Sequence, residues 1–537
     1  MSEEIKADYC IAGAGAAGVV LASKLAAAGK TIVVLEQGPR FSEEDRDDML
    51  LQSQEKLNDF ADYNDNVRPG VVTPHTSASH GDQVVEWTAQ RLFGVGGTAL
   101  HFDGHMIRPR EEDFRTKTLF GIGRDWPVAY SDLEPWLLRA ERETGVSGNE
   151  DNPYASPRSG PFPMPAHPFS YFDREIFKPA LKRLGIVGHS SPRAINSKPY
   201  RGRSECLACR ACKFCPSGAR YSPDRVHVPM IDKRSNVTLL ENVSLQRLEA
   251  APKGTRIVVA HAVRIREKTP LVVRAKRFIL TSGGVETPRM LLLSADKGVH
   301  RAGLGNMGGQ LGRRFSDHTN PAVTYNLGRS VGGRLGFETM ISEHFRALKD
   351  RREQPTLIIF ASPAIDYMPI GNEAALWAAR GDILSLDALR KIIPQMVTLW
   401  AMTELEGEGL LELDKENLDA FGSPVAKITM KLTDWDRRGH TKLAELVPQI
   451  GEAMGARNVA EIPPPGFGLG YHPSGTTAMA KSPDNGVCDP NLRVFGLENL
   501  YLVSNSIFPH MGANPPTLTI VALALRLAVY LEGRTAL

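Results

Sequence analysis

A glycine-rich turn near the start of the chain constrains its fold more than any other feature. Gly13, Gly15 and Gly18 follow an apolar run at 9–12, and an Ala- and Leu-rich stretch begins directly after them. A second apolar run covers 31–35. Strand, turn, helix and strand within about 30 residues predict a βαβ unit whose two strands are parallel.

Each part of this unit suits a bound dinucleotide. The glycines permit a tight turn, close approach of the backbone to a pyrophosphate, and close packing of helix on strand. The helix that begins at Ala16 and Ala17 directs its free N–H groups and positive end at the phosphates. Glu36, at the end of the second strand, can accept hydrogen bonds from ribose hydroxyls. The motif predicts a dinucleotide but does not distinguish FAD from NAD.

Size and composition exclude several other classes of protein. A length of 537 residues suggests two to four domains. The net charge of +3 is too small to indicate binding of nucleic acid. The longest apolar stretch, 518–531, is interrupted by Arg526 and is shorter than the roughly 20 residues that span a bilayer. We therefore expect no transmembrane segment. The N-terminal residues also lack the basic and apolar regions of a secretion signal, so we expect no leader in this chain.

The pattern of strands, helices and prolines predicts how the domains are divided. Six prolines at 152–169 favour an extended crossover between domains. Strand-like runs mixed with helical patterns fill the middle of the chain, and βα structure returns near its end. We therefore expect a nucleotide-binding domain made of 1–165, 225–318 and 480–537, a Cys-rich insertion or crossover at 166–224, and a substrate-binding domain at 319–479.

A series of motifs along nearly the whole chain resembles the glucose–methanol–choline (GMC) oxidoreductase superfamily. The motifs are IAGAGAAG at 11–18, GVGGT at 94–98, SGGVETPR at 282–289, NMGGQLG at 306–312, HPSGTTAM at 472–479 and NPPTLT at 514–519. The chain is most similar to pyranose oxidases and to the large subunits of bacterial sugar and gluconate dehydrogenases. The resemblance implies the α/β GMC fold, in which a Rossmann-like FAD-binding domain of discontinuous segments joins a substrate domain with an antiparallel sheet and helices.

The resemblance also implies a catalytic pair, His472 and Asn514. An alcohol carbon can lose a hydride to flavin N5 only as its O–H proton departs, and a histidine that titrates near neutrality suits that base role. Asn514 would hydrogen-bond the substrate oxygen beside it. The structural alternatives are a histidine held in a loop and an asparagine that caps the helix after Pro516.

The same resemblance predicts the residues around the flavin. His101 falls where pyranose oxidases link a histidine covalently to FAD; a covalent bond, simple proximity and plain packing all stay open. The helix after Pro516 should direct its positive end at the pyrimidine edge of the flavin. The full predicted set is Gly13, Gly15, Ala16, Ala17, Gly18, Glu36, Gly96, Gly97, Thr98, His101, Gly283, Asn505, Pro515 and Thr517.

Four of the six cysteines form the pattern C-x2-C-x2-C-x2-C: Cys206, Cys209, Cys212 and Cys215. Thiolates this close together on one loop hold an iron–sulfur cluster or a zinc ion. Zinc sites usually separate two such pairs by a dozen or more residues, so the unbroken spacing favours iron. Dehydrogenases of the resembled branch carry a Cys-rich insertion with a cluster, although their spacing is less regular. Zinc, free thiols and a disulfide remain alternatives.

A cluster beside a flavin would carry single electrons outward. The expected function is FAD-dependent oxidation of an alcohol carbon of a sugar or glycoside, with electrons leaving to an external acceptor. The resemblance suggests a small companion subunit and a cytochrome or quinone acceptor. The export signal of that companion could take this chain to the periplasm, and the cytoplasm is the other possible compartment.

Three other functions compete with this one. The first is an oxidase that returns electrons to oxygen as hydrogen peroxide. The second is a redox-silent lyase, which would have no electrons to pass to the cysteines. The third is an electron-transfer subunit, which would not need His472 and Asn514. The substrate itself is not predicted; Trp377, Trp400 and Trp435 could stack on a sugar ring, but a place in the core suits each of them better.

Overall fold

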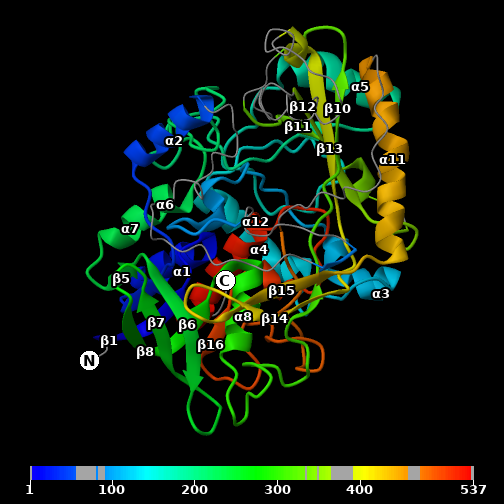
Figure 1. The fold of residues 1–537 in the computed structure, drawn as a ribbon. Coiled ribbons are helices and arrows are strands. Elements are labelled where there is room, and N and C mark those ends of the chain that lie inside the picture. The colour runs from blue at the N-terminus through cyan, green and yellow to red at the C-terminus, as the bar shows by residue number, and fades with distance from the viewer. Residues whose placement is uncertain are drawn as a thin grey trace.

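The first layer of the structure is a mixed sheet built around the N-terminal strand (Figure 1). The computed structural model describes residues 3–55, 80–82, 91–332, 336–347, 350–363, 391–456 and 472–533. Strands follow one another as β5, β2, β1, β8, β7 and β6, with β16 beside the end of β8. They are β1 (Glu3–Ala12), β2 (Ile32–Leu35), β5 (Val237–Leu240), β6 (Val243–Ala250), β7 (Ile257–Arg264), β8 (Thr269–Leu280) and β16 (Leu500–Leu502).

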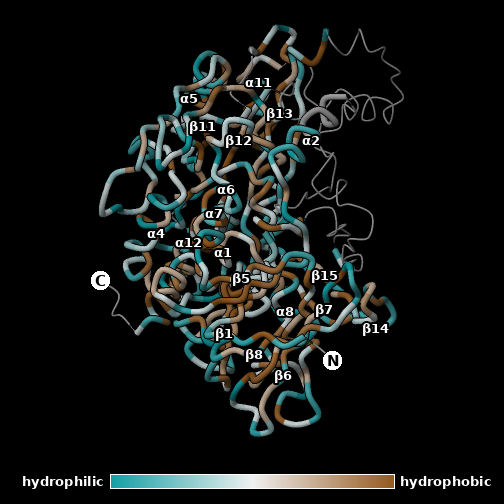
Figure 2. The backbone as a smooth tube through the Cα atoms, turned by 90° about the vertical axis from the view of Figure 1, so that its left-hand side faces the viewer, coloured by the Kyte–Doolittle hydropathy of each residue, from teal (hydrophilic) through white to brown (hydrophobic). Residues whose placement is uncertain are grey.

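Strand β1 pairs in parallel on both of its sides, with Tyr9 opposite Ile32 of β2 and opposite Arg277 of β8. Its last four residues are buried, and all of β2 is buried. Unbroken apolar runs of this kind are typical of parallel strands covered on both faces. Figure 2 shows these hydrophobic strands inside the lower half of the molecule. The predicted βαβ unit is confirmed.

Four long helices belong to this half of the molecule. Helix α12 packs against α1 and α4, and α8 packs against β6 on one side and β14 on the other. Among the described residues no helix is both long and apolar enough to cross a bilayer. The helices of this half are α1 (Ala16–Ala27), α4 (Tyr130–Thr144), α6 (Pro223–Val226), α7 (Val228–Asp232), α8 (Gly283–Leu293) and α12 (Thr517–Leu531). Helices α2 (Glu43–Glu55) and α3 (Thr116–Phe120) are the other described helices outside the second core.

A second apolar core lies between an antiparallel sheet and two helices in the upper half of Figure 1. Tyr325 and Leu399 of the sheet pack in this core with Ile450 of α11 and Leu181 of α5. The sheet has the order β10–β13–β12, which agrees with the expected antiparallel substrate domain. Its elements are β10 (Ala322–Asn326), β12 (Leu357–Pro363), β13 (Met396–Thr403), α5 (Lys178–Arg183) and α11 (Asp434–Met454).

Smaller elements join the two halves. The sheet β3–β15–β14–β9 packs against α8, and β4 pairs with β11. The remaining strands are β3 (His80–Gly81), β4 (His189–Ser190), β9 (Arg313–Phe315), β11 (Met340–Ile341), β14 (Gly409–Leu418) and β15 (Pro424–Met430). Single turns of 3₁₀ or π helix are η2 (Gly97–Leu100), η3 (Glu111–Arg115), η4 (Asp173–Phe177), η5 (His344–Arg346), η7 (Ile393–Gln395) and η8 (Asn505–Ile507).

Helix α11 begins at Asp434, with Thr433 as its N-cap. The side chain of Thr433 accepts the backbone N–H of Asp436, and the carboxylate of Asp436 accepts the backbone N–H of Thr433. This reciprocal cap satisfies two N–H groups that the helix cannot satisfy itself. The indole of Trp435 donates to the backbone oxygen of Arg351 at 2.6 Å, which places this tryptophan in the core.

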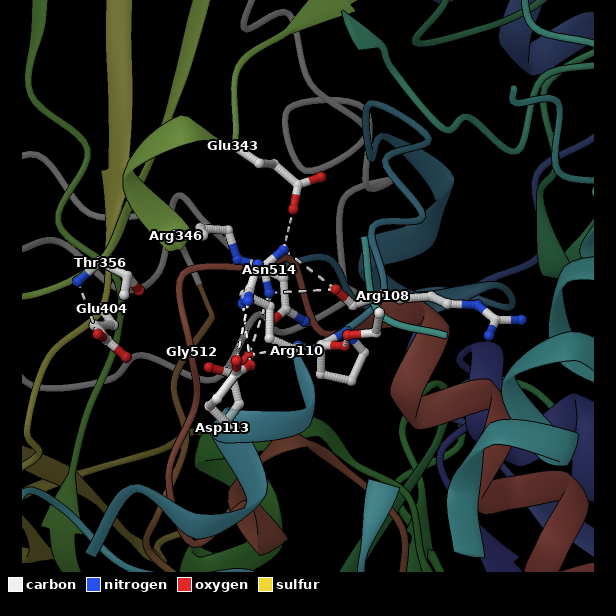
Figure 3. A network of polar contacts seen from close by, with 12 residues as sticks. Arg108, Arg110, Asp113, Glu343, Arg346, Thr356, Glu404, Gly512 and Asn514 are labelled. Atoms are coloured by element: carbon white, nitrogen blue, oxygen red, sulfur yellow. Dashed lines mark hydrogen bonds and ion pairs between the residues drawn. The ribbon is translucent and has the colours of Figure 1, made fainter. Parts of the chain in front are cut away.

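A buried ion network holds the second domain on the first (Figure 3). Arg351 donates to Asp113 at 2.7 Å and forms a second ion pair with Glu404, which also accepts from His510 at 3.0 Å. Burial alone would raise the pKa of Glu404, but the charge of Arg351 and the hydrogen bond from His510 hold it below its usual value. The network therefore contains charges that compensate each other.

Replacement of Arg351 by Met should destabilise the protein strongly, because two buried carboxylates would lose their shared cation. Loss of one partner from a buried ion pair costs about 3–5 kcal/mol. The free energy of unfolding, measured by chemical denaturation, tests this. The control is Arg352→Met, since Arg352 is exposed and pairs only with Asp350. Equal losses in the two variants would contradict the importance of the network.

Candidate active site

The turn after β1 forms a cradle of backbone groups. Helix α1 begins with Gly15 as its N-cap, and no side chain caps its first N–H groups. A β-carbon at Gly18 would lie 2.0 Å from the backbone oxygen of Gly13, so only glycine fits there. Gly13 has a φ of 105°, which also favours glycine. Uncapped N–H groups at a helix N-terminus are a ready anion-binding site.

A second glycine pair closes against this turn. Gly96 pairs with Gly15 in an isolated parallel bridge. A β-carbon at Gly97 would lie 2.9 Å from the Cα of Gly15. Thr98 lies in η2, and His101 follows this turn as a partly exposed side chain. The structure thus brings the predicted residues of 96–98 to the predicted phosphate turn.

Other predicted residues also lie where parallel strands end. The carboxylate of Glu36 accepts backbone N–H groups of Ala14 at 2.7 Å and Gly38 at 3.0 Å. Its burial raises the pKa to about 7. Gly283 follows β8 with open space around its Cα, and Asn505 follows β16 in η8. These residues converge because β2, β1, β8 and β16 all end at one edge of the sheet.

His472 lies against a second histidine that the sequence analysis did not select. The Nδ1 atoms of His472 and His318 are 2.9 Å apart, and His318 Nε2 donates to the backbone oxygen of Gly512 at 2.7 Å. Asp317 accepts the backbone N–H groups of both histidines at 2.8 and 2.6 Å. His318 and Asp317 are fully buried, whereas His472 is only partly buried.

These contacts specify the protonation of both rings. Burial lowers the pKa of His318 to about 4 and lowers that of His472 well below its usual value, so both rings are neutral near pH 7. A carbonyl can only accept, so His318 carries its proton on Nε2, and its Nδ1 must accept. His472 therefore donates through Nδ1, and its Nε2 keeps an unprotonated lone pair. Burial also raises the pKa of Asp317, to about 7.

Asn514 is buried two residues after Gly512 in the chain (Figure 3). Its Oδ1 lies 3.4 Å from an amino group of Arg346, which donates to it. Arg346 is held by Asp113 and Glu343. The amide of Asn514 is therefore oriented with its oxygen toward Arg346 and its NH₂ group turned away from that arginine.

The alternative role of Asn514 as a helix cap is wrong. Helix α12 begins at Thr517 with Pro516 as its N-cap and without a capping side chain. The predicted Pro515 and Thr517 do lie at this helix start. The uncapped N–H groups match the expected positive helix end beside the flavin.

Sequence reasoning missed three residues of this site: Asp317, His318 and Arg346. The pair Asp317–His318 follows the glycine-rich motif at 306–312, and that position was a usable signal. Arg346 stands in an unremarkable polar stretch and carried no signal. The glycine loop at 466–470 that precedes His472, and Trp377, lie outside the described residues.

Comparisons with known proteins agree with this geometry. Residues 7–320 and 406–524 match the two models of the GMC oxidoreductase family. The chain belongs to the GMC oxidoreductase family. It is an FAD-dependent enzyme that acts on CH–OH groups, as its relatives are dehydrogenases and oxidases of that kind.

Several curated relatives of this GMC oxidoreductase match over nearly their whole length. The fructose dehydrogenase large subunit of Gluconobacter japonicus is 29% identical over 98% of each chain. The gluconate 2-dehydrogenase flavoprotein of Pantoea cypripedii is 23% identical over 95% of this chain and 91% of its own. The structure of pyridoxine 4-oxidase from Mesorbium loti has a TM-score of 0.68 at 19% identity, covering 98% of this chain and all of the other, and shows the same fold.

The residues present fit an FAD molecule. The uncapped start of α1 offers N–H groups for the pyrophosphate, and the glycines at 13, 15, 18, 96 and 97 leave no β-carbon in its way. Glu36 ends β2 next to the turn. Asn505 follows β16 in η8, and no side chain caps the start of α12.

The four cysteines lie on one loop whose backbone bends repeatedly. Ala208, Arg210 and Cys215 have left-handed φ angles of 52°, 65° and 36°. Such angles are uncommon outside glycine and are held only where the surroundings demand them. Cys209 is exposed, and the other three cysteines are partly or fully buried.

The sulfur atoms of this loop act as hydrogen-bond acceptors. Cys206 Sγ accepts the N–H of Ala208 at 3.4 Å, and Cys215 Sγ accepts the N–H of Arg220 at 3.2 Å. Burial raises the pKa of Cys206, and the neighbouring Cys215 and Cys209 raise it further. All six cysteines are free thiols in this structure, so no disulfide forms within the loop.

Replacement of Gly18 by Ala should release FAD, because the new methyl group would meet the backbone oxygen of Gly13 and the hydroxyl of Thr281. We expect FAD affinity to fall at least about tenfold, equivalent to ~1.4 kcal/mol. The ratio of flavin to protein absorbance after dialysis measures this. Gly298→Ala is the control, since no atom lies within 3.5 Å of that site. Full retention of FAD by the Gly18 variant would show that the turn is not the phosphate cradle.

Proposed function

We propose that this enzyme oxidises an alcohol carbon of a sugar or glycoside, with His472 as the base, and passes the electrons through an iron–sulfur cluster to an external acceptor. The observation that carries the proposal is the neutral histidine pair. His472 is fixed by His318 with an unprotonated Nε2, which is the atom that a base needs. FAD, when bound, supplies the hydride acceptor at its N5 atom.

His472 removes the hydroxyl proton as the adjacent C–H bond breaks. Its Nε2 accepts that proton, while its Nδ1–H stays hydrogen-bonded to His318. The developing charge on His472 is stabilised by this neighbour, which is in turn held by the backbone oxygen of Gly512. A positioned base of this kind contributes about 10²–10⁴-fold to a rate.

Asn514 complements the base. With its Oδ1 occupied by Arg346, its NH₂ group can donate to the substrate oxygen as negative charge develops there. Arg346 acts through Asn514 and is a positioning residue. His318 donates to the backbone oxygen of Gly512, two residues before Asn514, so one buried segment helps to position both the base and the amide.

A sugar or glycoside as substrate is supported by the relatives. The relatives include a fructose dehydrogenase subunit and a gluconate dehydrogenase flavoprotein. Phe360 and Trp400 stack at 3.8 Å between ring centroids, and they pack in one apolar cluster with Ala513, next to Asn514. The indole N–H of Trp400 is buried without a hydrogen-bond partner. Phe360 is fully buried and Trp400 is only 7% exposed, so this pair lies in the core, the place expected for Trp400.

The electron route is supported by the cysteine loop. A single zinc ion places its sulfur ligands about 3.8 Å apart, as follows from Zn–S bonds of about 2.3 Å. In the described residues only Asp317, His318 and His472 bring three possible metal-ligand atoms within 4.8 Å of one another. The cysteine sulfurs of the described residues are not gathered that closely, so the cluster is proposed from the spacing of the four cysteines in the sequence. An iron–sulfur cluster takes up and releases one electron at a time, so it would pass electrons from the flavin to an external acceptor.

The partners of this route are also part of the proposal. The names of two relatives, a large subunit and a flavoprotein, suggest assembly with further chains. We infer a small companion subunit and a cytochrome or quinone acceptor, with the periplasm reached through the companion. The second candidate is an oxidase that makes hydrogen peroxide, and the oxidases among the relatives favour it, such as paromamine 6'-oxidase of Streptomyces fradiae at 26% identity.

The rate of flavin reduction by substrate should not fall as the pH decreases through 6.5. An ordinary histidine base gains a proton near pH 6.5, and its rate falls below that pH. The lowered pKa keeps His472 neutral, so its lone pair stays available as the pH falls through 6.5. Anaerobic stopped-flow absorbance with D-fructose, D-glucose, D-gluconate and a glucoside measures this.

The variant His472→Gln should reduce the flavin about 10²–10⁴-fold more slowly at every pH while it keeps its FAD. His261→Gln is the control, because His261 pairs with Glu249 on the β6–β7 hairpin. A rate that falls around pH 6.5 in the wild type, or a His472 variant as fast as the control, would contradict the base assignment.

Replacement of Cys212 by Ser should remove the iron and keep flavin reduction. The thiolate is the metal ligand, and a hydroxyl is a poor substitute. Substrate should still bleach the flavin under argon, but transfer to cytochrome c should stop. Iron and acid-labile sulfide assays measure the first effect. Cys488→Ser, a buried cysteine outside the loop, should keep both. A wild type without iron that releases peroxide would favour the oxidase.

A further inference from the structure

Arg220 is buried between the cysteine loop and the loop beside His101. Its side chain is only 2% exposed. Every N–H of its guanidinium donates to a backbone oxygen, and a guanidinium has five such donors. The acceptors and distances are Cys212 at 2.6 Å, Lys213 at 2.8 Å, Leu100 at 2.5 Å, Phe102 at 2.8 Å and Ala99 at 3.2 Å.

These five acceptors belong to two functional segments. Two are carbonyls of the cysteine loop, and three lie on 99–102, which contains His101 and continues from Gly96 and Gly97. The backbone N–H of Arg220 also donates to Cys215 Sγ. One side chain therefore fixes the distance between the cysteine sulfurs and the segment that borders the predicted flavin.

The charge of Arg220 has no carboxylate partner. A guanidinium stays protonated in proteins, and a buried charge is costly unless an opposite charge lies near. In the described part of the chain, no Asp or Glu forms an ion pair with Arg220. Asp224 and Glu43, the acids in the neighbouring segment, pair with Arg46 and Arg225 instead. The backbone N–H of Arg220 donates to Cys215 Sγ at 3.2 Å, so a cysteine sulfur lies directly beside this residue.

We propose that Arg220 is the charge partner and positioning residue of the metal centre held by the four cysteines. The inference rests on the electron route of the proposed function. When an electron passes from the reduced flavin to this centre, the centre gains one negative charge. The fixed positive charge of Arg220 stabilises that added charge and raises the reduction potential of the centre. Its bonds to 99–102 keep the centre within reach of the flavin.

The two electrons from one alcohol leave in two such steps. The alcohol carbon gives a hydride to the flavin, and its hydroxyl proton goes to His472. Each step then moves one electron to the centre and onward to a one-electron protein acceptor, such as cytochrome c. The hydrogen that came as hydride leaves as a proton to water, so atoms and charge balance.

The test compares Arg220→Gln with the wild-type holoenzyme. Potentiometric titration followed by electron paramagnetic resonance gives the potential of the centre. The equilibrium constant for its one-electron reduction should fall about tenfold, which corresponds to about 59 mV for such a couple. In anaerobic stopped flow with substrate, reduction of the centre should slow about tenfold relative to bleaching of the flavin.

Arg201→Gln is the matched control. It removes the same charge from the same loop, but Arg201 is exposed and pairs with Glu143, so solvent screens it. Its potential should stay near that of the wild type. Arg220→Lys keeps the charge and loses the five-bond fork, so its potential should stay close to the wild type while transfer slows. If the Arg220→Gln variant fails to fold, the Arg220→Lys variant tests the role of Arg220 by itself.

The outcomes separate the two proposals. A wild type without iron or a paramagnetic signal overturns the electron route, and this inference with it. A wild type with such a centre, whose potential and rate of reduction are unchanged by loss of Arg220, overturns only the role of Arg220. Equal shifts of potential in the Arg220 and Arg201 Gln variants would also overturn it, because the buried position would then carry no special weight.

Discussion

The parallel pairing of β1 on both of its sides is the constraint on which the rest of the structure depends. It brings the ends of β2, β1, β8 and β16 to one edge, although these strands come from the beginning, middle and end of the chain. Glu36, Gly13, Gly283 and Asn505 follow those ends. Ligands of open α/β sheets bind outside the carboxyl ends of the strands. The backbone hydrogen bonds of a buried sheet therefore place the dinucleotide site.

Burial then determines the chemistry above this edge. The second domain is held by the network of Arg351, Asp113 and Glu404, and it encloses His318. Burial makes both histidines neutral. His318 donates to the backbone oxygen of Gly512 and accepts from His472, which leaves the lone pair of His472 on its Nε2 atom. A single histidine in water would lack both the fixed tautomer and the low pKa. The same packed segment orients Asn514, so base and hydrogen-bond donor are positioned together.

At the cysteine loop a buried side chain keeps its charge, in contrast to the two neutral histidines. Here a cation, Arg220, is buried without an acid partner among the described residues, and its charge is spread over five backbone carbonyls. Carbonyl dipoles can solvate a guanidinium, but they do not neutralise it. A loop that gathers thiolates beside such a cation suits an anionic centre. The histidine pair loses its charge through burial, whereas a guanidinium stays protonated in proteins even where it is buried.

The sequence by itself determined the family, the first βαβ unit and most of the residues along the dinucleotide edge. Those features are local: glycines at fixed spacing next to apolar runs permit one backbone path. It also pointed to His472 and Asn514, whose motifs are short and continuous. Only the tertiary structure decided what surrounds them. His318 is 154 residues from His472, and Arg346 is 168 residues from Asn514. Contacts between such distant segments depend on packing of whole domains, which no local pattern records.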